Sequence, residues 1–182
     1  MKNLFTKEEL ETTSFKDIKT FQDACKALSL DYNSILSIIN QLKSVSRASA
    51  AMFKLNIIRK ALNLGQDLHL TKDSNTYYPY NPFVTKSSTY YESMINSGKM
   101  EVIGKIKSEG EEYNVLGGVA YTGIAGLSNF DSDSGVGFAD TAVGFLGCAY
   151  KEIAQHLGKY FGMLITEAKY GDIEDFEVIS KL

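Results

Sequence analysis

The amino-acid sequence predicts an α+β protein with an N-terminal helical layer, an antiparallel sheet of about three to four strands, and a C-terminal helix packed on the sheet. Three observations lead to this prediction. Apolar residues recur at helical spacing in the first third of the chain and again after about residue 149. Stretches of strand character, separated by turn residues, lie between these two regions. Glycine follows the same division: among the 15 glycines, only Gly65 precedes Gly98.

Length and composition favour a single domain over residues 1–182. Of the 182 residues, 44% are hydrophobic and 23% are charged, as in ordinary globular proteins. We expect a helical part in residues 1–65 and an aromatic extended segment in residues 66–99. Residues 100–182 are expected to hold the sheet, the C-terminal helix and an acidic tail. The net charge of −3 argues against a strongly basic nucleic-acid binder but leaves room for a local basic patch.

Three helices are expected to form the main part of the N-terminal layer. Thr20 is suited to cap the first helix, with Asp23 in its first turn. After a break at residues 31–33, Ser34 is expected to cap the second helix, and Gly65 to end the third in the C′ position. The expected apolar faces are Phe21, Ala24, Cys25 and Leu28, then Ile35, Ile38, Ile39 and Leu42, then Ala51, Met52, Leu55, Ile58 and Leu62.

An aromatic run, Tyr77–Phe83, marks the middle segment. Pro79 and Pro82 exclude a helix within this run and disfavour a central strand. We therefore expect an extended segment that packs over a sheet edge or over the mouth of the core.

The second half of the chain is expected to supply the sheet and the last helix. Met100–Lys107 and Tyr113–Thr122 have strand character and flank a glycine-containing turn, which predicts a hairpin. Val136–Val143 is a candidate third strand. A helix is expected over about Ala149–Leu164, and the tail Glu167–Leu182 is expected to form a short strand or a docking segment.

Motifs for catalysis or metal binding are incomplete. Asp131 and Asp133 resemble the start of a calcium loop, but the residues that follow break the pattern, so a solvated turn is favoured. Gly135–Asp140 lacks the third glycine of a dinucleotide loop, and a bulged strand is favoured there. The chain has only two histidines, His69 and His156, so a two-histidine metal site or a Ser–His–Asp triad is poorly supported. We expect no catalytic residue, no metal and no cofactor, and hence no enzyme.

The two cysteines, Cys25 and Cys148, form no CxxC pair, and Cys148 is interpreted as a small buried hydrophobic residue. Glu152 and His156, four residues apart on the last predicted helix, are interpreted as a polar surface contact. Met1–Glu11 is charged and lacks the apolar run of a secretory leader, and no stretch is apolar enough to span a membrane. These features predict a reduced protein without membrane contact.

Aromatic and basic side chains give the candidate binding residues. The aromatic run Tyr77–Phe83 has two interpretations. One is a binding surface, since Tyr is favoured at interfaces and can stack on bases or sugars. The other, favoured about two to one, is a proline-stiffened lid whose aromatic side chains fill the core. The basic residues of the helical part are interpreted as a solvated face more readily than as a phosphate track. The candidate surface residues are Tyr77, Tyr78, Tyr80, Phe83, Arg47, Lys54, Arg59 and Lys60, and the candidate pocket residues are Tyr121 and Tyr150, with Tyr78 and Tyr80.

Four stretches of the chain, in order, resemble a pattern found in small proteins, of no assigned activity, that phages and prophages of gut Bacteroidales encode. Phe21–Asp31 is similar to FEDACxALGID, and Lys54–Gly65 to YKLxxIAxALNEG. Tyr77–Tyr80 is similar to the start of YYPWF, and Val143–Phe161 to VGSRLCFKSxELAxxxGKQF. The resemblance spans the chain from about residue 21 to 164.

The chain departs from this pattern at several places. The tryptophans of the pattern are absent, with Gln66, Leu70 and Tyr80 near their positions, and Phe145–Gly147 stands where the pattern has Ser-Arg before the cysteine. The resemblance implies a phage or prophage origin, a compact single domain, and a location in the host cytoplasm or the virion. It implies no activity.

Three functions are compatible with these observations. The first is a non-enzymatic phage protein that acts through protein–protein contacts, as an oligomeric virion or assembly component whose partners are its own copies or other phage proteins. The second is a nucleic-acid-associated accessory protein, in which Tyr77, Tyr78 and Tyr80 stack on bases and the basic residues contact phosphates. The third is a binder of a small, nucleotide-like ligand that interferes with host defence.

Overall fold

A computed structural model describes residues 14–65, 75–81, 83–84, 89–108, 110–117, 119–124 and 146–181, with the backbone alone at 14, 75, 76, 78, 80, 84, 89, 90, 119–124 and 181. The predicted third strand at 136–143, the loop residues Asp131 and Asp133, Gly135–Asp140 and His69 lie outside the described residues.

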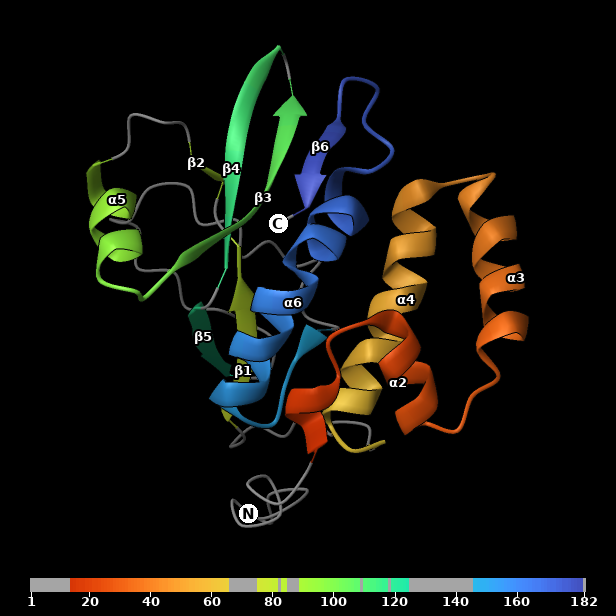
Figure 1. Cartoon of the computed structure of the whole chain (residues 1–182). Coiled ribbons are helices and arrows are strands. Elements are labelled where there is room, and N and C mark those ends of the chain that lie inside the picture. The colour runs from red at the N-terminus through yellow and green to blue at the C-terminus, as the bar shows by residue number, and fades with distance from the viewer. Residues whose placement is uncertain are drawn as a thin grey trace.

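The described elements form an α+β fold, as predicted. Helices precede and follow the main run of strands, and the long C-terminal helix lies between the sheet and the N-terminal helices (Figure 1). The helical elements are η1 (Ser14–Asp17), α2 (Phe21–Ala27), α3 (Tyr32–Lys43), α4 (Arg47–Leu62), α5 (Thr89–Asn96) and α6 (Lys151–Tyr170). The strands are β1 (Asn75–Tyr80), β2 (Phe83–Val84), β3 (Glu101–Ser108), β4 (Glu111–Gly117), β5 (Val119–Ile124) and β6 (Glu177–Lys181).

The strands form two antiparallel sheets. The larger sheet has four strands in the order β2-β4-β3-β6, and β1 pairs with β5 in the smaller one. The predicted hairpin is present as β3 and β4, which pair from Ser108–Glu111 to Glu101–Gly117 around a left-handed Gly110. The tail was predicted to form a short strand or a docking segment, and it forms a short strand, β6.

The single strand predicted at Tyr113–Thr122 is wrong, because the chain divides it between the two sheets. β4 ends at Gly117, which lies so close to α6 that an added Cβ would stand 2.8 Å from the Gly158 carbonyl oxygen. From Val119 the chain pairs with β1 instead of β3. The continuous run of strand-forming residues hides this change of partner.

The extended segment predicted at 66–99 is only partly correct. Residues 75–80 are a strand whose Pro79 is buried, and this strand lies in a two-stranded sheet, where proline is tolerated. The helix α5 was not expected. Its residues Tyr91, Met94 and Ile95 have helical spacing and pack against buried Met100 and Leu116, so apolar burial stabilises a helix after the prolines.

The helix ends show which side chains satisfy the free backbone groups. Thr20 and Asp23 form a reciprocal capping box at α2, as expected for that cap. The cap predicted at Ser34 is wrong, because Asp31 accepts a hydrogen bond from the Ser34 amide at 2.9 Å and α3 begins at Tyr32. The carboxylate of Asp31 reaches the amide three residues ahead, so the predicted break is the cap itself.

The end of α4 differs from the prediction by one residue. The left-handed C′ residue is Leu64, with φ 58°, and Gly65 follows it. Leu64 donates its amide to Ala61 and Gly65 to Lys60, which is the hydrogen-bond pattern of a Schellman motif. Two predicted core residues are exposed: Ile38 on α3 is 43% exposed and Met52 on α4 is 37% exposed.

The core lies on both sides of α6. On one side, α6 packs against α4 and the N-terminal segment through buried residues that include Leu55, Ile58, Ile153 and Leu157. On the other side, Met163 packs with residues of β3, β4 and the tail. The helix runs to Tyr170, beyond the predicted end at 164, because Ile165 and Thr166 are still buried. Within the described residues, no helix has the length and apolar character needed to cross a bilayer.

Candidate functional site

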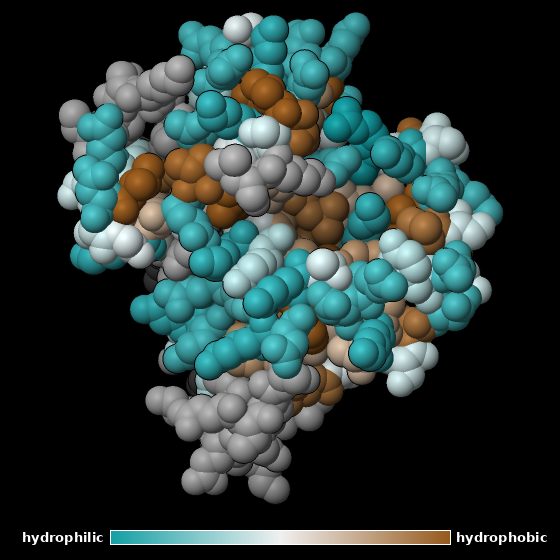
Figure 2. Space-filling model, viewed as in Figure 1, coloured by the Kyte–Doolittle hydropathy of each residue, from teal (hydrophilic) through white to brown (hydrophobic). Residues whose placement is uncertain are grey.

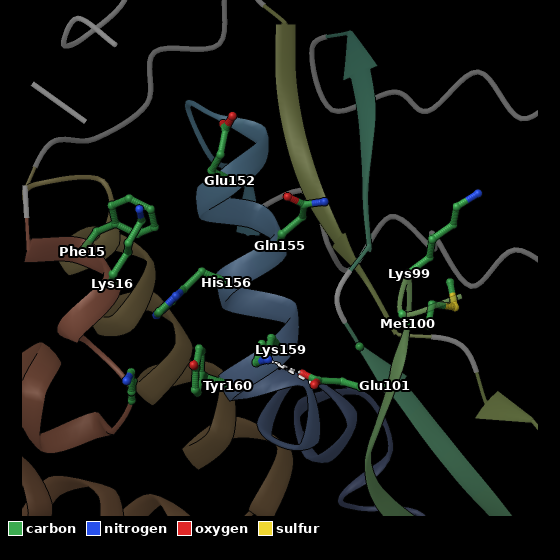
Figure 3. A pocket seen from close by; sticks show the side chains of 13 residues that line it. Phe15, Lys16, Lys99, Met100, Glu101, Glu152, Gln155, His156, Lys159 and Tyr160 are labelled. Atoms are coloured by element: carbon green, nitrogen blue, oxygen red, sulfur yellow. Dashed lines mark hydrogen bonds and ion pairs between the residues drawn. The ribbon is translucent and has the colours of Figure 1, made fainter. Parts of the chain in front are cut away.

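A groove of about 490 Å³ crosses the outer face of α6. The N-terminal segment forms one wall, and the residues that lead into β3 form the other (Figure 3). Between them, α6 contributes side chains at positions 152, 155, 156, 159 and 160, whose spacing places them on one stripe of the helix. The face that carries α6 is largely hydrophilic across its centre (Figure 2). The lining residues are Phe15, Lys16, Lys19, Gly98, Lys99, Met100, Glu101, Gly117, Glu152, Gln155, His156, Lys159 and Tyr160.

Four lysines and two glutamates give the groove an excess of positive charge. Lys159 forms an ion pair with Glu101, with Nζ 2.9 Å from Oε1 and 3.1 Å from Oε2, and the Glu101 carboxylate raises the pKa of Lys159. Among the residues that the structure describes, Lys16, Lys19 and Lys99 have no carboxylate within ion-pair distance. These three ammonium groups are therefore available to an anionic ligand.

An exposed aromatic ring, Tyr160, lies beside two of these lysines, Lys19 and Lys159. The Nζ of Lys19 is 5.6 Å from the ring centroid and that of Lys159 is 5.7 Å away, both within cation–π distance. The ring of His156 lies 4.5 Å from the Tyr160 ring, centroid to centroid. Tyr160 is 40% exposed, so part of its ring remains open to solvent.

His156 connects the groove to the N-terminal segment. Its Nε2 is 2.7 Å from the carbonyl oxygen of Ile18, so Nε2 carries a proton and donates it to this oxygen. Phe15 meets the imidazole edge-on at 5.5 Å. Burial lowers the pKa of His156, and the ring is therefore held neutral near pH 7. Among the described residues, His156 contacts Ile18, Phe15 and Tyr160. Glu152, its predicted partner, is exposed at the groove wall.

The aromatic candidates from the sequence lie elsewhere. Tyr77 pairs through its backbone with Cys148, and its half-buried ring packs against the core beside α6. Phe83 packs against the sheet core and meets Tyr170 edge-on at 5.3 Å. Tyr78 is paired with Tyr121 across β1 and β5, where only the backbone is described, as it is for Tyr80.

The basic candidates are on α4, away from the groove. Arg47 lies 3.7 Å from the Glu167 carboxylate. The Nε of Arg59 is buried, and Lys54 and Lys60 are half-buried. Arg59, in the last turn of α4, lies close enough to Cys148, the backbone partner of Tyr77, for its charge to act on the thiol, whereas Arg47 is at the first residue of the helix. Tyr150 immediately precedes α6 and packs, half-buried, against the core.

Cys148 is fully buried, as expected for a small hydrophobic residue. Desolvation raises the pKa of its thiol to about 12, while the nearby charge of Arg59 acts in the opposite direction. The thiol is 3.4 Å from the Leu146 carbonyl oxygen. A thiol in these surroundings is not a nucleophile at neutral pH.

The sequence interpretation missed the lysines of the groove and Tyr160. The sequence did hold one signal, the polar stripe of α6 beside its apolar face, but such a stripe is also typical of a solvated helix. What makes it a site is the approach of Lys16, Lys19 and Lys99 from two distant segments.

The fold and the groove define an α+β protein with a lysine-lined surface site around an exposed tyrosine. Comparison with protein-family models, with curated proteins and with solved structures finds no match to the chain. Within the described part of the chain, no three His, Cys, Asp or Glu side chains are grouped closely enough to hold a metal ion.

Proposed function

We propose that the chain is a non-enzymatic binding protein that takes a small anionic ligand in the groove over α6. The observation that carries this proposal is the group Lys16, Lys19 and Lys99, which line the groove without a carboxylate partner among the described residues. The volume of about 490 Å³ is that of a ligand-sized cleft. Lysine ammonium groups around such a cleft attract anions, most strongly at low salt.

Two further observations support a binding role over catalysis. His156, the titratable ring in the groove, donates its Nε2 proton to a backbone carbonyl and is held neutral by burial. Cys148 is buried with its thiol protonated. The surroundings of His156 and Cys148 thus suit a structural role for both side chains better than a role as acid, base or nucleophile.

The test is a calorimetric titration with inorganic pyrophosphate at low ionic strength. The double variant Lys19→Gln/Lys99→Gln is expected to weaken binding about tenfold, because two exposed charge interactions are lost. Glu101→Gln is expected to strengthen binding, because it frees Lys159 and removes a negative charge. The control Lys26→Gln/Lys43→Gln removes the same charge from exposed positions on α2 and α3. Equal loss in the control and in the groove variant would contradict the proposal.

A second function, self-association as a phage assembly component, is favoured by exposed apolar side chains on the N-terminal helices. Val45, between α3 and α4, is 89% exposed, and Ile38 and Met52 are also exposed. The phage origin and a location in the host cytoplasm or virion are part of this proposal. Size exclusion with light scattering tests it: a stable oligomer with a protein-only 260/280 nm ratio supports assembly, and a monomer with excess absorbance at 260 nm contradicts it.

A further inference from the structure

Resting on the proposed function, we infer that the ligand is a nucleoside phosphate whose base stacks on Tyr160 and whose phosphates are held by the surrounding lysines. An anion alone needs only the ammonium groups. The groove also presents an aromatic ring that is 40% exposed, placed between two lysines and beside His156. This arrangement matches a ligand that carries a planar ring and negative charge in one molecule.

The ring of Tyr160 has an open surface that a base can reach. Two lysine side chains, Lys19 and Lys159, lie over it, with Nζ atoms 5.6 and 5.7 Å from the centroid. Water weakens an exposed cation–π contact, so stacking of a base on the aromatic side chain stabilises more than the ammonium contact that it replaces. A base can therefore displace an ammonium group from the ring.

The displaced lysines remain close enough to meet the phosphates. Lys19 comes from the N-terminal wall and Lys159 from the same helix as Tyr160, so the two ammonium groups approach the ring from different elements. Lys99 lies on the opposite wall. Glu101 holds Lys159 until a phosphate competes for it. Tyr160 thus offers a surface on which the base can stack, and the lysines around it offer contacts for the phosphates.

The experiment compares three probes on the full chain by calorimetry: ADP, pyrophosphate and adenosine, without divalent metal. We expect ADP to bind more tightly than either of the other two. Tyr160→Ala is expected to weaken ADP binding about tenfold and to leave pyrophosphate binding nearly unchanged. Tyr160→Phe, which keeps the ring and removes the hydroxyl, is expected to retain ADP binding. The melting temperature of each variant verifies that it is folded.

The outcomes separate this inference from the proposed function. If pyrophosphate binds as tightly as ADP and Tyr160→Ala changes neither, the ring position is refuted while the anion site stands. If neither anion binds, both are refuted. A short single-stranded oligodeoxyadenylate identifies the source: tighter binding than ADP assigns the nucleotide to a nucleic-acid strand, and equal or weaker binding assigns it to a free nucleotide.

Discussion

Ser29 adopts a left-handed conformation, with φ 54°, directly after α2. Its amide donates to Lys26 and the next amide to Cys25, so Ser29 occupies the C′ position of a Schellman motif. An L side chain in this region costs about 1–2 kcal/mol, part of which glycine avoids.

Ser29→Gly is expected to stabilise the protein by about 0.5–1 kcal/mol, since Ser29 is exposed and its side chain packs against nothing that glycine would lose. Chemical denaturation measures the change. Leu64→Gly is the matched control: Leu64 has φ 58° but packs against the core beside α6, so the relief of strain there is offset by lost burial. A lower midpoint for Ser29→Gly than for the wild type would contradict the assignment.

At the scale of elements, α6 depends on glycines where other segments approach it. An added Cβ at Gly162 would collide with Ile103 Cδ1 and with the Asn81 side-chain amide. Asn81 itself donates to the carbonyl oxygens of Leu116 and Gly158, both at 2.9 Å, and so joins β4 to the helix. The close approach of α6 to the sheet therefore requires glycine at 162.

Gly162→Ala is expected to destabilise the protein by about 1–3 kcal/mol, because overpacking outweighs the better helix propensity of alanine. Gly158→Ala is the control on the same helix. Its Cβ would meet Pro79 Cβ at 3.2 Å, a contact that small shifts relieve, so its stability is expected to change by less than about 1 kcal/mol. Thermal unfolding followed by circular dichroism compares the two. Equal effects would show that Asn81 and Ile103 move aside without cost.

The sequence predicts elements better than it predicts their partners. The N-cap at Thr20 and the apolar face of α6 depend on neighbours within one or two turns, and both were predicted. The division of β4 from β5 and the contact of Gly162 with Asn81 depend on residues far along the chain, and neither has a local signal. Local spacing fixes a helix or strand, but tertiary packing decides what it meets.

At the scale of the molecule, the groove exists only because three distant segments meet. Lys16 lies before α2, Lys99 before β3 and Lys159 on α6. In the sequence, nothing distinguishes these three lysines from other lysines. Charge patterning therefore placed the candidate basic residues on α4 instead.

The stability of the whole molecule is expected to fall as the pH decreases through neutrality, because of His156. Burial lowers the pKa of His156, so the unfolded chain takes up this proton at a higher pH than the folded chain. The stabilisation is complete above the unfolded pKa, near 6.5, and is lost as the pH falls toward the folded value. The loss is at most about 1.4 kcal/mol per pH unit, the value for one proton.

Urea unfolding at several pH values between about 7.5 and 5 measures this slope. The carboxylates with lowered pKa, Asp23, Asp31 and Asp172, act in the same direction but only near and below their ordinary value of 3.8, outside this range. His156→Gln is expected to flatten the pH dependence, since glutamine has no charge to gain. His69→Gln, the substitution at the other histidine of the sequence, controls for the loss of an imidazole from the chain. If His156→Gln retains the wild-type slope, the pH dependence does not come from His156.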